Sequence, residues 1–99
     1  MRTAALFTFD TSHKQLKEKT RFYRELYGYT DSSYFGKYVY ERKGILSDIP
    51  HLRPTESVVI LKSEHRHLLR DFLKKEKVRF SEHKIILSKE EASKINLTL

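Results

Sequence analysis

Two short apolar runs constrain the fold of this chain more than any other feature. Residues 3–9 read T-A-A-L-F-T-F, and residues 56–61 end in the unbroken run V-V-I-L. A continuous apolar run of this length is typical of a strand that is covered on both faces. We therefore expect Thr3–Phe9 to be a buried strand and Glu56–Leu61 to be a central strand of the same sheet.

Two longer segments carry apolar residues at helical spacing. The first is Lys14–Tyr27, preceded by the capping-box pattern Ser12-His13-Lys14-Gln15 and followed by Gly28. The second is Glu64–Lys77, where Ser63 can cap the first turn. A capping residue before such a pattern and a glycine after it are typical boundaries of an amphipathic helix.

The remaining segments are shorter and less regular. Thr30–Ser33 is polar and indicates a turn, while Gly36–Tyr40 predicts a strand. Ile45–Pro54 holds both prolines and indicates an irregular connection. Val78–Phe80 and Lys84–Leu87 predict a last strand or a bulged pair, and Ser88-Lys89-Glu90-Glu91 opens a short C-terminal helix.

The resulting order is β-α-β-β-α-β with a tail helix. This order is the split βαβ pattern and predicts an α+β, ferredoxin-like fold in a single basic domain over residues 1–99. Its helices would cover one face of the sheet, which leaves the other face for a partner or the tail helix.

Composition excludes several classes of protein. The chain has no cysteine, which rules out disulfides, thiol catalysis and thiolate zinc sites. The absence of disulfides favours an intracellular protein, and we expect a cytoplasmic one. No run approaches the roughly 20 apolar residues of a membrane span, so we expect no membrane partner. Abundant Lys, Arg and Glu would also suit a thermophile.

The net charge of +7 favours an acidic partner such as nucleic acid. Residues 11–53 carry nine Lys and Arg against five Asp and Glu, and residues 62–84 carry eight against four. On each expected helix the cations form a stripe, which either follows a phosphate backbone or is an ordinary solvated face. The two stripes are Lys14, Lys17, Arg21 and Arg24, and Arg66, Arg70, Lys74 and Lys77.

Tyrosines and cations interleave between Tyr27 and Arg53. Aromatic rings can stack on unpaired bases while cations hold phosphates, which is the chemistry of RNA and single-strand binding. The alternative is that Tyr23, Tyr27 and Tyr38 belong to the core. The residues that we expect to bind nucleic acid are Tyr34, Lys37, Tyr38, Tyr40, Arg42, Lys43 and Arg53.

Asp10 ends the first apolar strand, just before a polar Thr-Ser pair. In length, element order and this strand end, the chain resembles the small ferredoxin-like subunit of the CRISPR spacer-integration complex. The resemblance implies that Asp10, one from each subunit of a homodimer, holds a divalent metal such as Mg²⁺ for phosphodiester cleavage. The alternative is that Asp10 only marks the end of the strand or is a charge at the N-terminus of the following helix, which the helix dipole favours.

Three functions remain open from these residues. The first is a non-catalytic nucleic-acid-binding domain that prefers RNA or single-stranded DNA and needs no cofactor. The second is a metal-dependent nuclease or integration subunit that uses Asp10. The third is a protein-interaction module of a larger assembly, with Tyr34–Pro54 as its docking surface.

Overall fold

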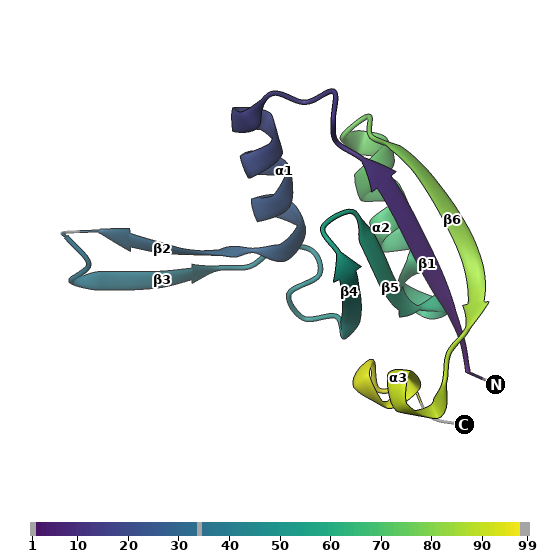
Figure 1. Cartoon of the computed structure of the whole chain (residues 1–99). Coiled ribbons are helices and arrows are strands. Elements are labelled where there is room, and N and C mark those ends of the chain that lie inside the picture. Colours follow the sequence, from purple (N-terminus) through teal and green to yellow (C-terminus); the bar gives the residue numbers. More distant parts are fainter. Residues whose placement is uncertain (1, 34, 98–99) are drawn as a thin grey trace. The chain divides into compact units, whose positions relative to one another are not determined.

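The computed structural model describes residues 2–33 and 35–97 of the chain. The chain divides into two compact units, Met1–His13 with Ile49–Leu99 and Lys14–Asp48. We call them the sheet unit and the hairpin unit. The mixed α and β class is confirmed, because the described residues form a four-stranded antiparallel sheet and several helices (Figure 1).

The sheet unit is built on four antiparallel strands in the order β4-β5-β1-β6. These are β1 (Thr3–Asp10), β4 (His51–Thr55), β5 (Val58–Lys62) and β6 (Arg79–Ile86). The two interior strands, β1 and β5, are the two apolar runs of the sequence. The prediction of a central strand at residues 56–61 is thereby confirmed, with the strand beginning two residues later.

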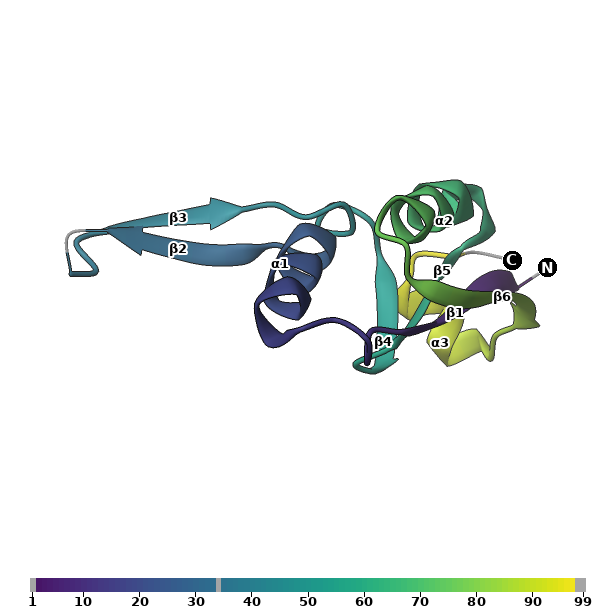
Figure 2. The same cartoon turned by 90° about the horizontal axis from the view of Figure 1, so that it is seen from above.

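One face of this sheet carries large buried side chains. Phe7 of β1 lies opposite Val59 of β5, and both are buried. Helix α2 (Arg66–Lys75) lies on this face, where the Arg70 side chain reaches Glu82 of β6 (Figure 2). Three residues of α2 at helical spacing are buried, namely Leu69, Phe72 and Leu73.

The opposite face of the sheet is covered by the tail helix α3 (Lys89–Lys94). Ala4 of β1 and Ile60 of β5 form a buried apolar cluster with Ala92 and Ile95. The expected cap of α3 is confirmed, because the Ser88 hydroxyl accepts a hydrogen bond from the Glu91 amide at 3.1 Å. The tail helix thus buries a sheet face that would otherwise be open.

Two expectations for the sheet unit were wrong in detail. The segment read as irregular, Ile45–Pro54, contains most of strand β4, because an edge strand with an irregular register tolerates a proline. Ser63 does not cap α2, which follows a short 3-10 helix, η1 (Ser63–His65), and has His65 at its N-cap. Of the two alternatives for the C-terminal segment, the single last strand is confirmed, because β6 is continuous and pairs with β1 along eight residues.

The hairpin unit consists of helix α1 (Leu16–Tyr27) and the strands β2 (Tyr29–Ser33) and β3 (Tyr38–Arg42), which pair with each other (Figure 1). The turn expected over Thr30–Ser33 is therefore wrong, since these polar residues gain backbone partners from β3. The strand expected over Gly36–Tyr40 begins later, because Gly36 has a φ of +86° and belongs to the turn.

The start of α1 also differs from the expectation. The Ser12 amide donates to the Asp10 carboxylate at 2.8 Å, and the N-cap of α1 is Gln15, whose side chain makes no capping bond. The capping box over residues 12–15 is therefore wrong. At 12 residues, α1 is the longest helix in the described ranges, and none there is long and apolar enough to cross a membrane.

Candidate nucleic-acid interface

The pairing of β2 with β3 places three tyrosines on one face of the hairpin. Tyr29 lies opposite Arg42, Asp31 opposite Tyr40, and Ser33 opposite Tyr38. Residues that lie opposite each other, or two apart on one strand, share a face of a β-ribbon. Tyr29, Tyr38 and Tyr40 therefore share one face, which we call the tyrosine face.

Each ring of the tyrosine face has a cation over it. The Arg24 guanidinium of α1 lies 4.5 Å from the centre of the Tyr29 ring. Lys37 Nζ lies 5.7 Å from the Tyr38 ring, and the Arg42 guanidinium lies 5.5 Å from the Tyr40 ring. The interface therefore alternates aromatic surface with positive charge.

The tyrosine face is open to solvent. Tyr38 is 45% exposed and Tyr40 is 47% exposed, and every residue of β3 is classed as exposed. The alternative in which Tyr38 belongs to the core is therefore wrong. Tyr23 and Tyr27 agree better with the alternative that they belong to the core. Both are half-buried, and their rings stack with centres 6.1 Å apart.

The base of the hairpin is fixed by the C-terminus of α1. The last four carbonyls of a helix lack partners inside the helix. Here the carbonyls of residues 24, 25 and 26 accept from the amides of residues 28, 45 and 46, and the Ser47 hydroxyl donates to the Tyr27 carbonyl. The loop after β3 thus supplies hydrogen-bond donors for the carbonyl groups at the C-terminal end of α1.

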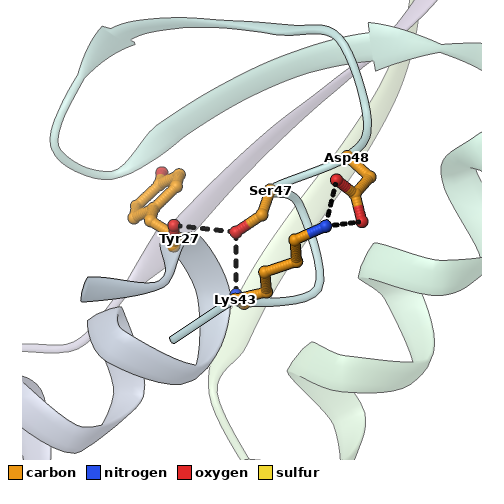
Figure 3. A network of polar contacts seen from close by, with 5 residues as sticks. Tyr27, Lys43, Ser47 and Asp48 are labelled. Carbon is orange, nitrogen blue, oxygen red and sulfur yellow. Dashed lines mark hydrogen bonds and ion pairs between the residues drawn. The ribbon is translucent and has the colours of Figure 1, made fainter. Parts of the chain in front are cut away.

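Two side chains of the same loop, Ser47 and Lys43, form hydrogen bonds within the loop. The Ser47 hydroxyl accepts from the Gly44 amide at 2.8 Å, and Lys43 Nζ donates to both carboxylate oxygens of Asp48 (Figure 3). Lys43, an expected phosphate ligand, is thus paired but still well exposed.

Two glycines allow the close approach of backbone at this junction. A Cβ on Gly28 would lie 2.6 Å from the Arg42 carbonyl oxygen, and a Cβ on Gly44 would lie 2.7 Å from the Leu26 carbonyl. Gly28 also has a φ of +83°, which side chains rarely adopt. The sequence analysis used Gly28 only as the end of a helix.

The expected binding residues fall into three groups. Lys37, Tyr38, Tyr40 and Arg42 come together on the hairpin, with Lys43 at its base. Arg53 is exposed on β4 and belongs to the sheet unit. Tyr34 lies outside the described residues.

Two members of the interface were missing from the expected set. Tyr29 and Arg24 form the shortest cation–ring contact among the described residues of the hairpin unit, and both are exposed. The signal that could have found Tyr29 was its place among the closely spaced tyrosines. Arg24 could not be assigned before the end of α1 and the start of β2 were known.

The cationic stripe of α2 is partly neutralised within the sheet unit. Arg70 and Glu82 form a bidentate pair at 2.7 Å, and this bond raises the pKa of Arg70 and lowers the pKa of Glu82. Desolvation opposes both shifts. Two other cations of this stripe that lie within α2, Arg66 and Lys74, are exposed.

Asp10 lies at the exposed end of β1. Hydrogen bonds from the hydroxyl and the amide of Ser12 lower the pKa of its carboxyl group, and its partner in the sheet register is Arg79. Within residues 2–33 and 35–97, no group of three or more His, Asp or Glu side chains is placed to hold a metal ion. The role of Asp10 as a metal ligand stays a prediction.

Among the residues that the structure describes, the hairpin brings together four of the expected aromatic and cationic residues. Its surface is open, carries Asp31 beside its cations and is fixed at its base by hydrogen bonds. Comparisons with protein-family models, with curated proteins and with solved structures find no match to this chain.

Proposed function

We propose that this chain is a non-catalytic nucleic-acid-binding domain that prefers RNA or single-stranded DNA. The observation that carries the proposal is the tyrosine face, where Tyr29, Tyr38 and Tyr40 are exposed side by side and each has a cation over its ring. Aromatic platforms beside cations are the usual means of binding unpaired nucleotides.

A base that stacks on a tyrosine ring contributes more binding energy than the cation that it displaces from that ring. A cation over an exposed ring contributes about 0.5–1 kcal/mol, whereas a base stacked on the same ring contributes about 1–3 kcal/mol. A cation that leaves the ring can bind the phosphate of the incoming nucleotide. Lys37 is exposed, whereas Arg42 is exposed but also forms an ion pair with Asp31 at 3.7 Å, so Lys37 is the better placed of the two for this exchange.

The same geometry favours single strands over duplexes. A tyrosine can stack only on a base whose face is free, and in a duplex neighbouring base pairs cover those faces. The phosphates of a duplex could contact the cations, but its bases could not stack on the rings. We therefore expect duplex binding to be weaker and to depend more completely on salt.

For the sheet unit we infer a ferredoxin-like scaffold. Its antiparallel strand order, β4-β5-β1-β6, agrees with the split βαβ pattern, with α1 and α2 as the connecting helices. The β2–β3 hairpin is then an addition between the first helix and the second strand of that pattern. This additional hairpin carries the proposed interface.

The proposal is tested by fluorescence anisotropy with labelled oligonucleotides of about 12 nucleotides, a length within the known range of single-strand sites. RNA, single-stranded DNA and duplex DNA of mixed sequence are compared. We expect Tyr40→Leu to weaken single-strand binding roughly tenfold, the equivalent of about 1.4 kcal/mol, and Tyr40→Phe to retain it. Undetectable binding of all three probes by the wild type at low salt would overturn the proposal.

Two controls separate binding from other effects. Val39→Ala alters an exposed residue on the opposite face of the hairpin and should leave affinity unchanged. Labelled RNA and DNA incubated with Mg²⁺ should remain intact on a denaturing gel. Cleavage by the wild type that Asp10→Ala abolishes would replace the non-catalytic proposal with the nuclease one.

A further inference from the structure

Helix α1 lines a surface hollow of about 820 Å³ within the hairpin unit. Four cations line it, Lys17, Arg21, Arg24 and Lys43, against two acidic residues, Glu18 and Glu25. The lining therefore has a surplus of two positive charges. Such a surface attracts an anion.

Three of these cations form a row on α1. Lys17, Arg21 and Arg24 are spaced by four and three residues, which places them on one side of the helix, and all three are exposed. From the first to the third the row covers about 10 Å at 1.5 Å per residue. A row of this kind can contact successive phosphates of one strand.

Tyr29 connects this row to the tyrosine face. Its ring lines the hollow and lies under the Arg24 guanidinium, while its position in β2 puts it on the same face as Tyr38 and Tyr40. The hollow and the tyrosine face are thus one continuous surface, with Tyr29 and Arg24 at the point where they join.

The chemistry of the hollow differs from that of the hairpin. Between Leu16 at one end and Tyr29 at the other, the lining consists of charged side chains and Thr20. It offers no further ring on which a base could stack. It can neutralise phosphates, however, because Lys and Arg bind phosphate oxygens without reading the base.

We propose that this hollow is a phosphate track that holds the sugar-phosphate backbone of the same single strand whose bases stack on the tyrosine face. The inference rests on the proposed function and adds a second contact region to it. The bound strand runs from the hairpin, past Tyr29, along α1. Its bases make the hairpin contacts and its phosphates make the α1 contacts.

The track sets the length of strand that the unit can hold. From Tyr29 to Ser33 the hairpin face extends about 13 Å at about 3.3 Å per residue. Together with the row on α1 the path is about 23 Å long. Affinity should therefore rise with oligonucleotide length until the strand spans both the tyrosine face and the row on α1.

The test compares the double variant Lys17→Gln/Arg21→Gln with the matched variant Lys75→Gln/Lys89→Gln. The second pair removes the same charge from exposed positions of α2 and α3. Single-stranded RNA binding is measured by anisotropy at several salt concentrations, and circular dichroism verifies that both variants fold. Loss of two phosphate contacts should reduce the slope of log K against log salt by about 1.4 and weaken binding about 25-fold near 0.1 M salt.

The outcomes separate the two proposals. Under the phosphate track, the α1 variant shows the reduced salt slope and loses the gain in affinity that the wild type shows as the strand lengthens beyond the tyrosine face, while the matched variant keeps the wild-type slope and the gain. If the two variants behave alike while Tyr40→Leu still weakens binding, the track is wrong and the tyrosine face stands. If the wild type binds no oligonucleotide, both proposals are wrong.

Discussion

Strands β1 and β3 are both antiparallel and rich in aromatic residues, but they use these residues in opposite ways. Phe7 of β1 is fully buried between its neighbours, whereas Tyr38 and Tyr40 of β3 are almost half exposed. β1 has a strand on each side and a helix over each face of its sheet, and β3 has only β2. A two-stranded ribbon cannot bury its own side chains.

The comparison shows that the two strands separate aromatic residues that pack from aromatic residues that stay on the surface. Strand β1 buries Phe7 and Phe9 within the sheet unit. The hairpin unit also buries a ring, Phe22 of α1, but Tyr29, Tyr38 and Tyr40 on its strands stay exposed. Exposed rings offer area to a ligand, and this makes the hairpin the more informative region for function.

The largest predicted effect comes from removing one ring from each strand and comparing the loss of stability. Phe7→Ala should destabilise the protein by about 3–5 kcal/mol, because it removes a fully buried ring and leaves a cavity. Tyr38→Ala should cost about 0.5–1 kcal/mol, the value of its exposed contact with Lys37. Urea denaturation followed by circular dichroism measures both, and similar values would show that the hairpin is not an independent surface.

A second change tests the anchoring of the hairpin. Gly44→Ala would place a Cβ against the Leu26 carbonyl and the Gly28 backbone, so we expect a local cost of roughly 2–4 kcal/mol. Amide hydrogen exchange should accelerate over residues 29–42 and stay unchanged in β1 and β5. Gly36→Ala is the control, since its Cβ meets open space and costs only the strain of a positive φ, about 1 kcal/mol.

A third change concerns the ion pair of the sheet unit. Glu82→Gln removes the charged partner of Arg70 and should cost about 1 kcal/mol at pH 7, a modest value because both side chains are partly exposed. The folded-state pKa of Glu82 is lowered, so its stabilising contribution is complete above the ordinary value of 4.5 and is lost as the pH falls through the folded pKa.

Denaturation at neutral pH and at a pH below the folded pKa of Glu82 tests this pH dependence. The difference between wild type and Glu82→Gln should disappear in acid, and binding of single strands at neutral pH should be unaffected. A difference that persists in acid would mean that the carboxylate charge is not what stabilises the sheet unit.

The smallest effect is expected at the loop after β3. Ser47→Ala removes the bonds to the Gly44 amide and the Tyr27 carbonyl and should destabilise the hairpin unit by about 1 kcal/mol. Ser32→Ala, an exposed hairpin position, should change stability by less than about 0.5 kcal/mol. Amide hydrogen exchange in β2 and β3 distinguishes the two variants. Equal exchange rates in Ser47→Ala and Ser32→Ala would show that the loop does not anchor the hairpin.

Part of the candidate site was predictable from the sequence. The density of tyrosines and cations between Tyr27 and Arg53 pointed to the candidate interface, and four of the residues expected there lie together on the hairpin. Arg53 was grouped with them only because it is close in sequence. The polar segment Thr30–Ser33 concealed strand β2, because Ser and Asp are typical of turns and gain strand structure here only through pairing.

The sequence by itself determined the elements whose signals are local. The apolar runs became β1 and β5, the helical spacing gave α1 and α2, and Ser88 capped α3 as its capping box indicated. Only the tertiary structure decided the pairing of β2 with β3, the register that gathers three tyrosines on one face, and the position of Arg24 over Tyr29. These features depend on the register of backbone pairing and on the geometry at the end of α1, which the residue types do not specify, and a shift of one residue in register would move every tyrosine of β3 to the opposite face.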